Sequence, residues 1–138
     1  MVIFLINWRI RPDENSLQAF LSKWKTVLRV KNREGLIGEF LSRVRDANYF
    51  EYVTWEMGES SEEYRQHIKS DKFVSFVNVG LWRSKDDFLE NIGGNIPGDR
   101  WSMEDFEAAP RRRAVVEPEA WRIGSHSLTP DTSPGVFF

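Results

Sequence analysis

The fold is decided by the stretch Phe73-Val-Ser-Phe-Val-Asn-Val-Gly-Leu-Trp82, which Arg83-Ser-Lys-Asp-Asp87 follows directly. A run this rich in valine and phenylalanine predicts a β-strand. Ser84 begins a signature similar to a capping box, which marks the first turn of a helix. The apolar spacing over Lys85 to Ile92 predicts a short helix, and Gly93-Gly94 ends it. This junction therefore predicts a strand that leads directly into a helix.

The chain begins with a similar pair of elements. Apolar residues on both faces of Val2 to Arg11 predict a strand that is covered on both sides at its start. Arg11-Pro12-Asp13-Glu14 is a helix start signal, and apolar residues at helical spacing follow from Leu17 to Leu28. A polar loop ends at Gly35, after which the alternation over Leu36 to Arg45 predicts a second strand.

The remaining segments are less regular. Residues 46–72 are expected to form an insertion between the second and third strands, with a short capped helix over Ser60 to Ile68. Ser102 to Ala109 is expected to add two helical turns before a final strand over Arg111 to Ile123. Residues 125–138 contain two prolines and few periodic positions, and we expect them to be a C-terminal tail.

This order of elements predicts an α+β fold. Strand, helix, strand, insertion, strand, helix and strand form a βαββαβ unit, which is the ferredoxin-like arrangement with an antiparallel sheet. The 138 residues are enough for one domain with its own core, and no linker divides them. We therefore expect a single domain over residues 1–124.

Composition excludes several classes of function. The net charge of −2 gives no reason to expect nucleic acid or a membrane surface as a partner. With no cysteine and two histidines, a metal or haem centre is hard to build, and we expect no cofactor. The first residues lack the pattern of a secretory signal, so we expect a cytoplasmic protein. Aromatic residues make up 14% of the chain, which predicts a core of large rings or a pocket for a flat apolar ligand.

Three stretches carry a resemblance to a known family. They are Phe4-Leu-Ile-Asn-Trp8 with the helix through Phe20-Leu-Ser-Lys-Trp24, then Glu34-Gly-Leu-Ile-Gly-Glu-Phe-Leu41, and Phe76-Val-Asn-Val-Gly-Leu-Trp-Arg-Ser-Lys-Asp-Asp-Phe88. Together they resemble the antibiotic biosynthesis monooxygenase family, whose ferredoxin-like domains pair into a dimeric α+β barrel. The resemblance covers about half of the chain, and it implies the fold more directly than the function.

A second alignment of this resemblance is open. In it, Tyr52-Val-Thr-Trp55 and Glu62-Tyr-Arg-Gln-His67 form the strand–helix junction instead of the later stretch. We prefer the later junction because its β-run is longer and its helix cap is cleaner.

The resemblance implies a cofactor-independent monooxygenase that acts on a polycyclic aromatic or similar conjugated apolar substrate. It places Asn78 and Trp82 in the substrate cavity, where we expect them to be catalytic. The two residues are four positions apart on one strand, so they share a face, and Gly80 leaves space between them for a flat ligand. We expect the substrate-binding residues to be Asn7, Trp24, Phe76 and Phe88. Phe88 stands where the family has a phenol, and a phenylalanine cannot exchange a proton.

Other readings stay open beside this one. Asn7 resembles an asparagine of the haem-degrading branch, but the helix over Lys85 to Ile92 holds no histidine, and His67 lies in the insertion. A non-catalytic small-molecule-binding or scaffold dimer of the same fold is the main alternative. Trp82 would then be ordinary core and Asn78 would bond to a nearby loop.

Two groups of charged residues are predicted to be outside the site. Arg111-Arg-Arg113 is expected to be a solvated strand edge, because at strand spacing only one or two of the three residues face one side. The carboxylates Glu39, Glu51 and Glu56 show no spacing typical of an acid–base pair.

The partners expected are a small aromatic molecule and a second copy of the chain. A lone four-stranded sheet with helices on one side leaves its other face uncovered. We expect the residues of that face to include Ile3, Leu5, Val77, Val79 and Leu81. Two such faces packed together would form a mostly apolar homodimer interface.

Overall fold

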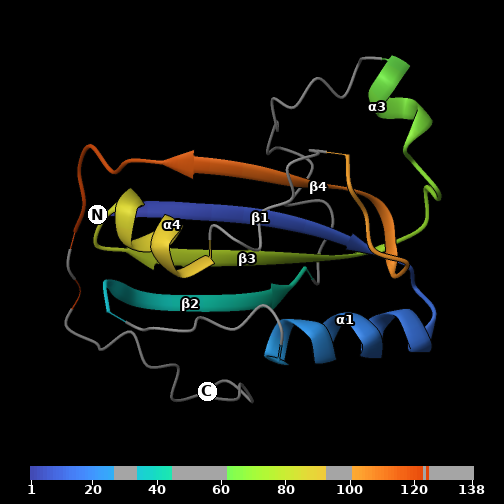
Figure 1. The fold of residues 1–138 in the computed structure, drawn as a ribbon, viewed down its shortest axis with the longest axis horizontal. Coiled ribbons are helices and arrows are strands. Elements are labelled where there is room, and N and C mark those ends of the chain that lie inside the picture. The colour runs from blue at the N-terminus through green and yellow to red at the C-terminus, as the bar shows by residue number, and fades with distance from the viewer. Residues whose placement is uncertain (27–33, 45–61, 93–100, 123, 125–138) are drawn as a thin grey trace.

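The computed structural model describes residues 1–26, 34–44, 62–92, 101–122 and 124 of the chain (Figure 1). Its elements, in order, are β1 (Val2–Ile10), α1 (Glu14–Thr26), β2 (Leu36–Arg43), α3 (Glu62–Gln66), β3 (Val74–Trp82), α4 (Lys85–Ile92) and β4 (Glu107–Val116). Apart from the short α3, which falls in the expected insertion, the order is β-α-β-β-α-β. The predicted ferredoxin-like α+β fold is confirmed.

The four strands form one antiparallel sheet in the order β2-β3-β1-β4. The register places Ile6 opposite Asn78 on β3 and opposite Arg113 on β4. Even-numbered residues of β1 and β3 therefore share one face, which we call the front face, and odd-numbered residues share the back face. In Figure 1, α1 and α4 lie on the viewer's side of the sheet, α4 near the start of β1 and α1 near its end.

Two clusters of rings make the core of the front face. One packs α1 against the end of β1, and its buried members are Trp8, Ile10, Phe20, Phe76 and Phe106. The other packs α4 against the start of β1, and its buried members are Val2, Phe4, Trp82 and Phe88. The ring of Phe20 lies 5.0–5.6 Å from three neighbouring rings at tilted angles, which are favourable geometries for aromatic pairs. The expected core of large rings is therefore present in two separate parts.

Both helices begin where the sequence predicts. At the start of α1, the carboxylate of Asp13 accepts a hydrogen bond from the backbone N–H of Ser16 at 2.9 Å and another from its hydroxyl at 2.8 Å. These bonds lower the pKa of Asp13. At the start of α4, the Ser84 hydroxyl accepts from the backbone N–H of Asp87, as in a capping box, and it also donates to the Asp87 carboxylate.

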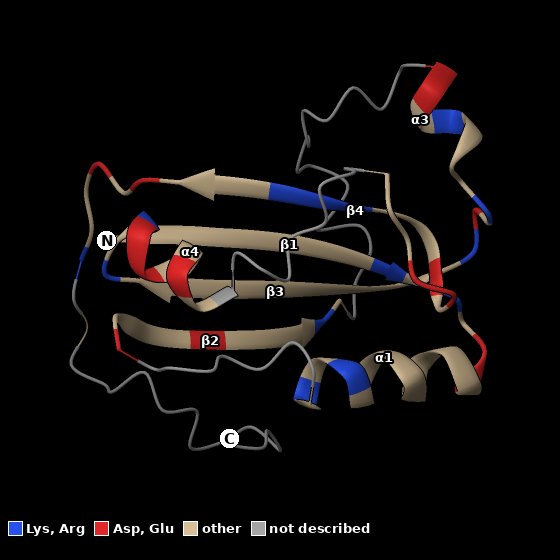
Figure 2. Cartoon of the chain, viewed as in Figure 1, with Lys and Arg blue, Asp and Glu red and all other residues tan. Residues whose placement is uncertain are grey.

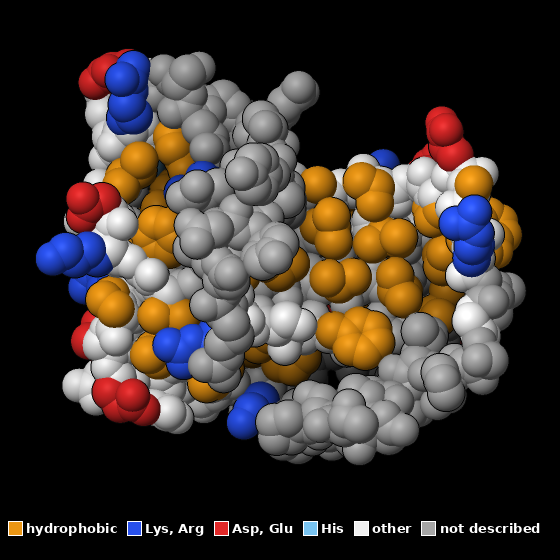
Figure 3. All heavy atoms as spheres, turned by 180° about the vertical axis from the view of Figure 1, so that it is seen from behind, with side chains coloured by type: hydrophobic (Ala, Val, Ile, Leu, Met, Phe, Trp, Pro, Cys, Tyr) orange, Lys and Arg blue, Asp and Glu red, His pale blue; other side chains and the backbone are white. Residues whose placement is uncertain are grey.

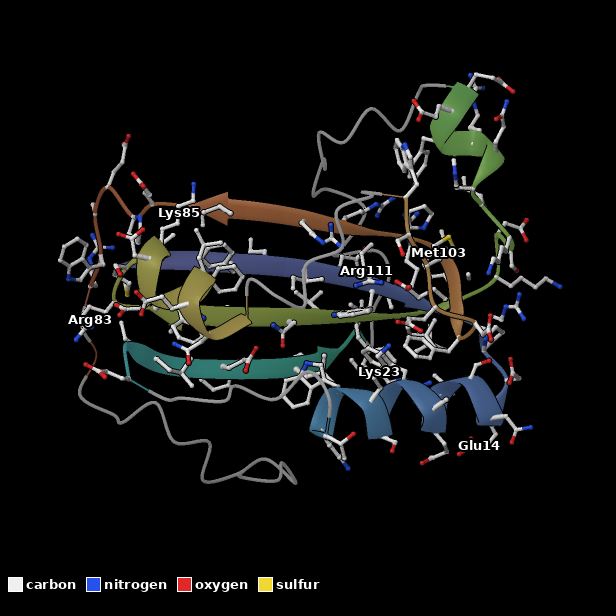
Figure 4. The ribbon with its side chains drawn as sticks, in the orientation of Figure 1. Glu14, Lys23, Arg83, Lys85, Met103 and Arg111 are labelled. Carbon is white, nitrogen blue, oxygen red and sulfur yellow. The ribbon has the colours of Figure 1, made fainter. Side chains whose placement is uncertain are left out.

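The loop before β2 is locked to the start of α4. Gly35 has a φ of +79°, and a Cβ there would lie 2.5 Å from the side chain of Asp87. The carbonyl of Gly35 accepts a hydrogen bond of 2.7 Å from the N–H of Arg83, which Figure 4 labels beside α4. A glycine is needed here both for the left-handed backbone and for the close approach.

The expected helix over Ser102 to Ala109 is wrong. Residues 102–104 have no regular structure, and β4 begins at Glu107 rather than at Arg111 and ends at Val116. The chain pairs with β1 from Glu107 onwards, and burial in the sheet outweighs the local helical spacing. The turn just before β4 is closed by two bonds between Glu104 and Glu107: the N–H of Glu104 donates to the Glu107 carboxylate, and the N–H of Glu107 donates to the Glu104 carbonyl.

Arg111 is also not the solvated residue that we expected. It is 8% exposed, and its guanidinium makes two hydrogen bonds of 2.9 and 3.0 Å to the carboxylate of Glu107. It also lies 4.5 Å from the ring centroid of Trp8. At the same end of the sheet, Lys23 of α1 pairs with Glu104; Lys23 and Arg111 are labelled in Figure 4. The ion pairs thus join β4 and the preceding loop to the α1 side of the core.

Pro110 lies inside β4, where a proline is unusual. The register with β1 shifts at this point, because three steps along β4 from Arg112 to Ala109 match two steps along β1 from Asn7 to Arg9. Such a β-bulge tolerates a residue that has no N–H to donate.

Several expectations lie outside the described residues. They concern Val27 and Leu28, residues 46–61 of the insertion with the alternative junction at Tyr52–Trp55, and the tail 125–138. Among the described residues, none of the helices is long and apolar enough to cross a membrane.

The buried pair of Glu107 and Arg111 gives a prediction about stability. Arg111→Met leaves the carboxylate of Glu107, which is 0% exposed, without its cation. Breaking a buried ion pair in this way costs about 3–5 kcal/mol, whereas replacing both partners by apolar residues is often neutral. We expect this loss of unfolding free energy in urea for Arg111→Met, and recovery of most of it in the double variant with Glu107→Leu. A loss of the same size in the double variant would contradict this explanation.

Candidate functional site

The site is centred on Asn78, between the two ring clusters of the front face. The indole N–H of Trp24, from the end of α1, donates to Oδ1 of Asn78 at 3.1 Å. The amide Nδ2 of Asn78 donates to Oε1 of Glu39 on β2 at 3.0 Å. Three side chains from three different elements are therefore linked in one chain of hydrogen bonds, which fixes the orientation of the amide.

The expectation that Gly80 leaves space for a flat ligand is wrong, because the indole of Trp82 lies over it. On the sheet, Gly80 lies between Glu39 of β2 and Phe4 of β1. A Cβ at Gly80 would lie 3.1 Å from Nε1 of Trp82, so the indole ring occupies the space that a side chain would fill. The absence of a side chain at this position therefore lets Trp82 lean back along β3 towards Asn78.

Trp82 and Phe88 close the α4 end of the site. Trp82 is 0% exposed, and its ring lies 5.8 Å from that of Phe88 in an edge-to-face arrangement. Phe88 stacks on Phe4 with ring centroids 3.4 Å apart. These contacts hold both aromatic residues firmly, so a ligand here would meet rigid rings.

Burial shifts the pKa of one charged side chain at the site, Glu39, and of another, Arg113, on the far side of β1. Glu39 is half-buried, and burial raises its pKa while the hydrogen bond from Asn78 opposes that rise. On the other side of β1, burial lowers the pKa of Arg113, and the charge of Arg111 adds to that effect. Figure 2 shows the acidic stretch of β2 and the basic stretch of β4 on opposite sides of the two central strands.

Five of the six residues that we predicted lie on one side of the sheet, but in two separate groups. Asn78, Trp82, Trp24, Phe76 and Phe88 all belong to the front face or to the helices that cover it. Asn78 and Trp82 share a face, as predicted, but Trp24 of α1 contacts Asn78, whereas Trp82 packs against Phe88 of α4. The spacing of four residues along β3 thus places them next to two different helices.

Asn7 is the predicted residue that lies apart from this group. Its amide donates to the hydroxyl of Ser75 at 2.7 Å and to the carbonyl of Phe76 at 3.1 Å. Because Ile6 is opposite Asn78, Asn7 belongs to the back face. It is fully buried there, and its contacts connect β1 to β3.

His67 also lies away from Asn78. It follows α3, where its ring stacks on Trp101 with centroids 5.4 Å apart, and its Nδ1 lies 2.7 Å from the carbonyl of Glu63. The described residues contain no group of three or more histidine, aspartate or glutamate side chains that could hold a metal ion.

Sequence reasoning missed two buried or half-buried charges. Glu39 was set aside because no second carboxylate stood at a useful spacing, yet its actual partner is an amide on the neighbouring strand. Arg9 of the back face was not considered, although it is 4% exposed. Its guanidinium bonds to the hydroxyl of Tyr64 and to the carbonyl of Pro110. The alternation along each strand assigns faces, but the register between strands decides which residues meet.

No protein-family model matches the chain, and no curated protein matches it. A ferredoxin-like fold supports many unrelated activities. The function therefore has to be argued from the side chains around Asn78.

The raised pKa of Glu39 gives a prediction about stability and pH. Because the pKa is higher in the folded protein than in the unfolded chain, folding favours the protonated carboxyl. The stability that this provides is present below the ordinary pKa of 4.5 and is lost as pH rises through the folded pKa. Glu39→Gln should therefore melt at a higher temperature than the wild type at neutral pH, with the difference closing in acid.

Melting curves over a range of pH would check this. Glu90→Gln, which removes an exposed carboxylate of α4, controls for the loss of one negative charge. A lower melting temperature for Glu39→Gln at neutral pH would show that the charged form of Glu39 stabilises the fold.

Proposed function

We propose that the protein is a cofactor-independent monooxygenase that acts on a polycyclic aromatic or similar conjugated apolar substrate. The observation that carries the proposal is the hydrogen-bonded chain of Trp24, Asn78 and Glu39, which lies between the two ring clusters of the front face. An apolar surface with a few converging polar groups is the usual form of a small-molecule site. The resemblance of the Phe76–Phe88 stretch to the antibiotic biosynthesis monooxygenases supports the same reading.

Asn78 has the group that such chemistry requires. Its Nδ2 carries two hydrogens, and one of them is donated to Glu39. The second has no partner among the described residues and is available to a phenolate or enolate oxygen. A donor that is already oriented stabilises the charge that develops on that oxygen. Trp24 takes no part in the chemistry. Its indole N–H donates to the side-chain oxygen of Asn78 and so holds the amide in place.

Phe88 favours a second candidate function. It occupies the position where the family has a phenol, and its ring is stacked on Phe4. It therefore supplies no proton to a bound molecule. A non-catalytic small-molecule-binding dimer with the same site is the alternative that this residue supports.

Asn78→Leu separates these functions from a purely structural role. Leucine is similar in size to asparagine but removes both hydrogen bonds of the amide. If Asn78 stabilises an oxyanion, we expect anthrone oxidation under air to fall by about 10²–10³-fold, as for the loss of one oxyanion donor. The measurement is quinone formation above the rate in buffer, with a ligand titration by tryptophan fluorescence beside it.

The outcomes of this experiment are distinct. Binding of anthrone without turnover by the wild type would favour the non-catalytic alternative. A drop in the melting temperature of Asn78→Leu with unchanged affinity and turnover would assign Asn78 a structural role, since losing buried hydrogen bonds costs about 1–3 kcal/mol.

We also propose that the back face binds a second copy of the chain. Ile3 is opposite Leu81 and Leu5 is opposite Val79, and all four are only half-buried. Figure 3 shows a broad hydrophobic surface on this face, towards the end of the sheet where β1 begins. Patches of this kind, larger than single scattered residues, are typical of interfaces.

Val79→Lys tests the dimer. Val79 is in the middle of this surface, between Leu5 and Phe40 on the neighbouring strands. Light scattering at micromolar concentration should give twice the mass of one chain for the wild type and the mass of one chain for Val79→Lys. Gln18→Lys, on the exposed side of α1, controls for the added charge. A monomeric wild type would overturn the proposal.

A further inference from the structure

Glu39 differs from the other carboxylate on the described strands. Within β1, β2, β3 and β4 the two acidic residues are Glu39 and Glu107. Glu107 is fully buried and is neutralised by Arg111. Glu39 is half-buried and has a neutral amide as its hydrogen-bond partner, with no ion pair among the described residues. A carboxylate that is partly removed from water without a cation lowers the stability of the fold. Such a group is therefore a candidate for a functional role.

We infer that Glu39 is the catalytic proton acceptor of this site and removes a proton from a carbon of the bound substrate. This inference rests on the proposed function, because it concerns the same substrate and the same site. It follows from three observations: Glu39 is held by Asn78, it is half-buried on the front face without an ion pair among the described residues, and Phe88 cannot exchange a proton.

The geometry gives the amide and the carboxylate separate tasks. One hydrogen of the Asn78 amide orients Glu39, while the other is free to bind the substrate oxygen. A carbonyl compound such as anthrone has an acidic C–H group across the ring from its oxygen. With its oxygen at Asn78, the molecule would turn the opposite edge of its central ring towards the front face beside Glu39, which is bonded to the same amide.

The reaction balances with dioxygen as the only co-reactant. Glu39 takes a proton from the ring CH₂, and the electron pair of that bond delocalises to the oxygen at Asn78. The anion gives one electron to dioxygen, and the resulting radical and superoxide join through a new C–O bond. The proton on Glu39 returns to the peroxide. Loss of the second C–H proton then breaks the O–O bond, releasing water and leaving the quinone carbonyl.

The surroundings of Glu39 suit a base. Burial raises the pKa of Glu39, which makes its carboxylate a stronger proton acceptor once it is ionised. The nearest parts of β3 and α1 contribute uncharged groups, Asn78 and Trp24. Among the charged groups of the surrounding elements, β2 has Arg43, and β1 has Arg9 on the back face. Helix α1 has Glu14, Lys25 and Lys23, which pairs with Glu104, and α4 has Lys85, Asp86, Glu90 and Asp87, which pairs with Arg83. Strand β4 has Glu107, Arg111, Arg112 and Arg113.

Proton removal can be measured without oxygenation. Anthrone is incubated anaerobically with the protein in D₂O, and the loss of its CH₂ signal is followed by proton NMR against buffer alone. We expect the wild type to accelerate the exchange and Glu39→Gln to lower this acceleration by about 10²–10⁴-fold, as for the loss of a general base. Glutamine keeps an oxygen that accepts from Asn78, so anthrone affinity should be unchanged.

Controls and pH complete the test. Glu90→Gln, on the exposed side of α4, should exchange like the wild type. The exchange rate of the wild type should fall as pH decreases through the pKa of Glu39, because the protonated carboxyl cannot accept a proton, and Glu39→Gln should lack this dependence. Melting curves for each variant establish that it is folded under the conditions of the assay.

The outcomes separate the two proposals. Equal exchange by the wild type and Glu39→Gln, or binding of anthrone without any acceleration by the wild type, would overturn the role of Glu39. Acceleration that depends on Glu39, without quinone formation when oxygen is admitted, would support Glu39 as a base and overturn the monooxygenase. No binding of anthrone by the wild type would overturn both.

Discussion

The antiparallel pairing of β1 with β3 is the constraint on which the rest of the structure depends. Nine consecutive pairs join these central strands, with Ile6 opposite Asn78. A slip of one residue would exchange the faces of one strand relative to the other. Asn78 and Trp82 would then lie on the back face, away from both α1 and α4. The site, the ring clusters and the apolar back face are thus consequences of one register.

That register also explains why the front face has a polar centre between two apolar ends. Each helix brings rings to one end of the sheet, Phe20 from α1 and Phe88 from α4. Neither cluster includes Asn78, which instead bonds to Trp24 and Glu39. A core of one continuous cluster would have covered this position with apolar side chains. Because the core is divided into two clusters, Asn78 and Glu39 can lie between them while the rings of both clusters stay buried.

Local patterns in the sequence predicted most helices and strands. Contacts between residues that are far apart in the sequence were predicted less well. Asp13 and Ser84 mark helix starts because a cap is made by neighbours three residues apart. Glu39 could not be recognised in this way, since its partner Asn78 is 39 positions away and is brought to it by the sheet. The start of β4 at Glu107 was missed for a related reason, because burial against β1 decided it over the local helical spacing.

The bulge at Pro110 has a consequence for how copies of the chain meet. β4 is an outer strand of the sheet, and outer strands offer free backbone groups to which a strand of another molecule can add. Pro110 has no N–H to offer, and the shift in register around it bends the strand away from the straight course that an added strand would need. This edge is therefore a poor template for extending the sheet from molecule to molecule. Growth of open-ended assemblies along β4 is therefore disfavoured by Pro110 and the register shift around it.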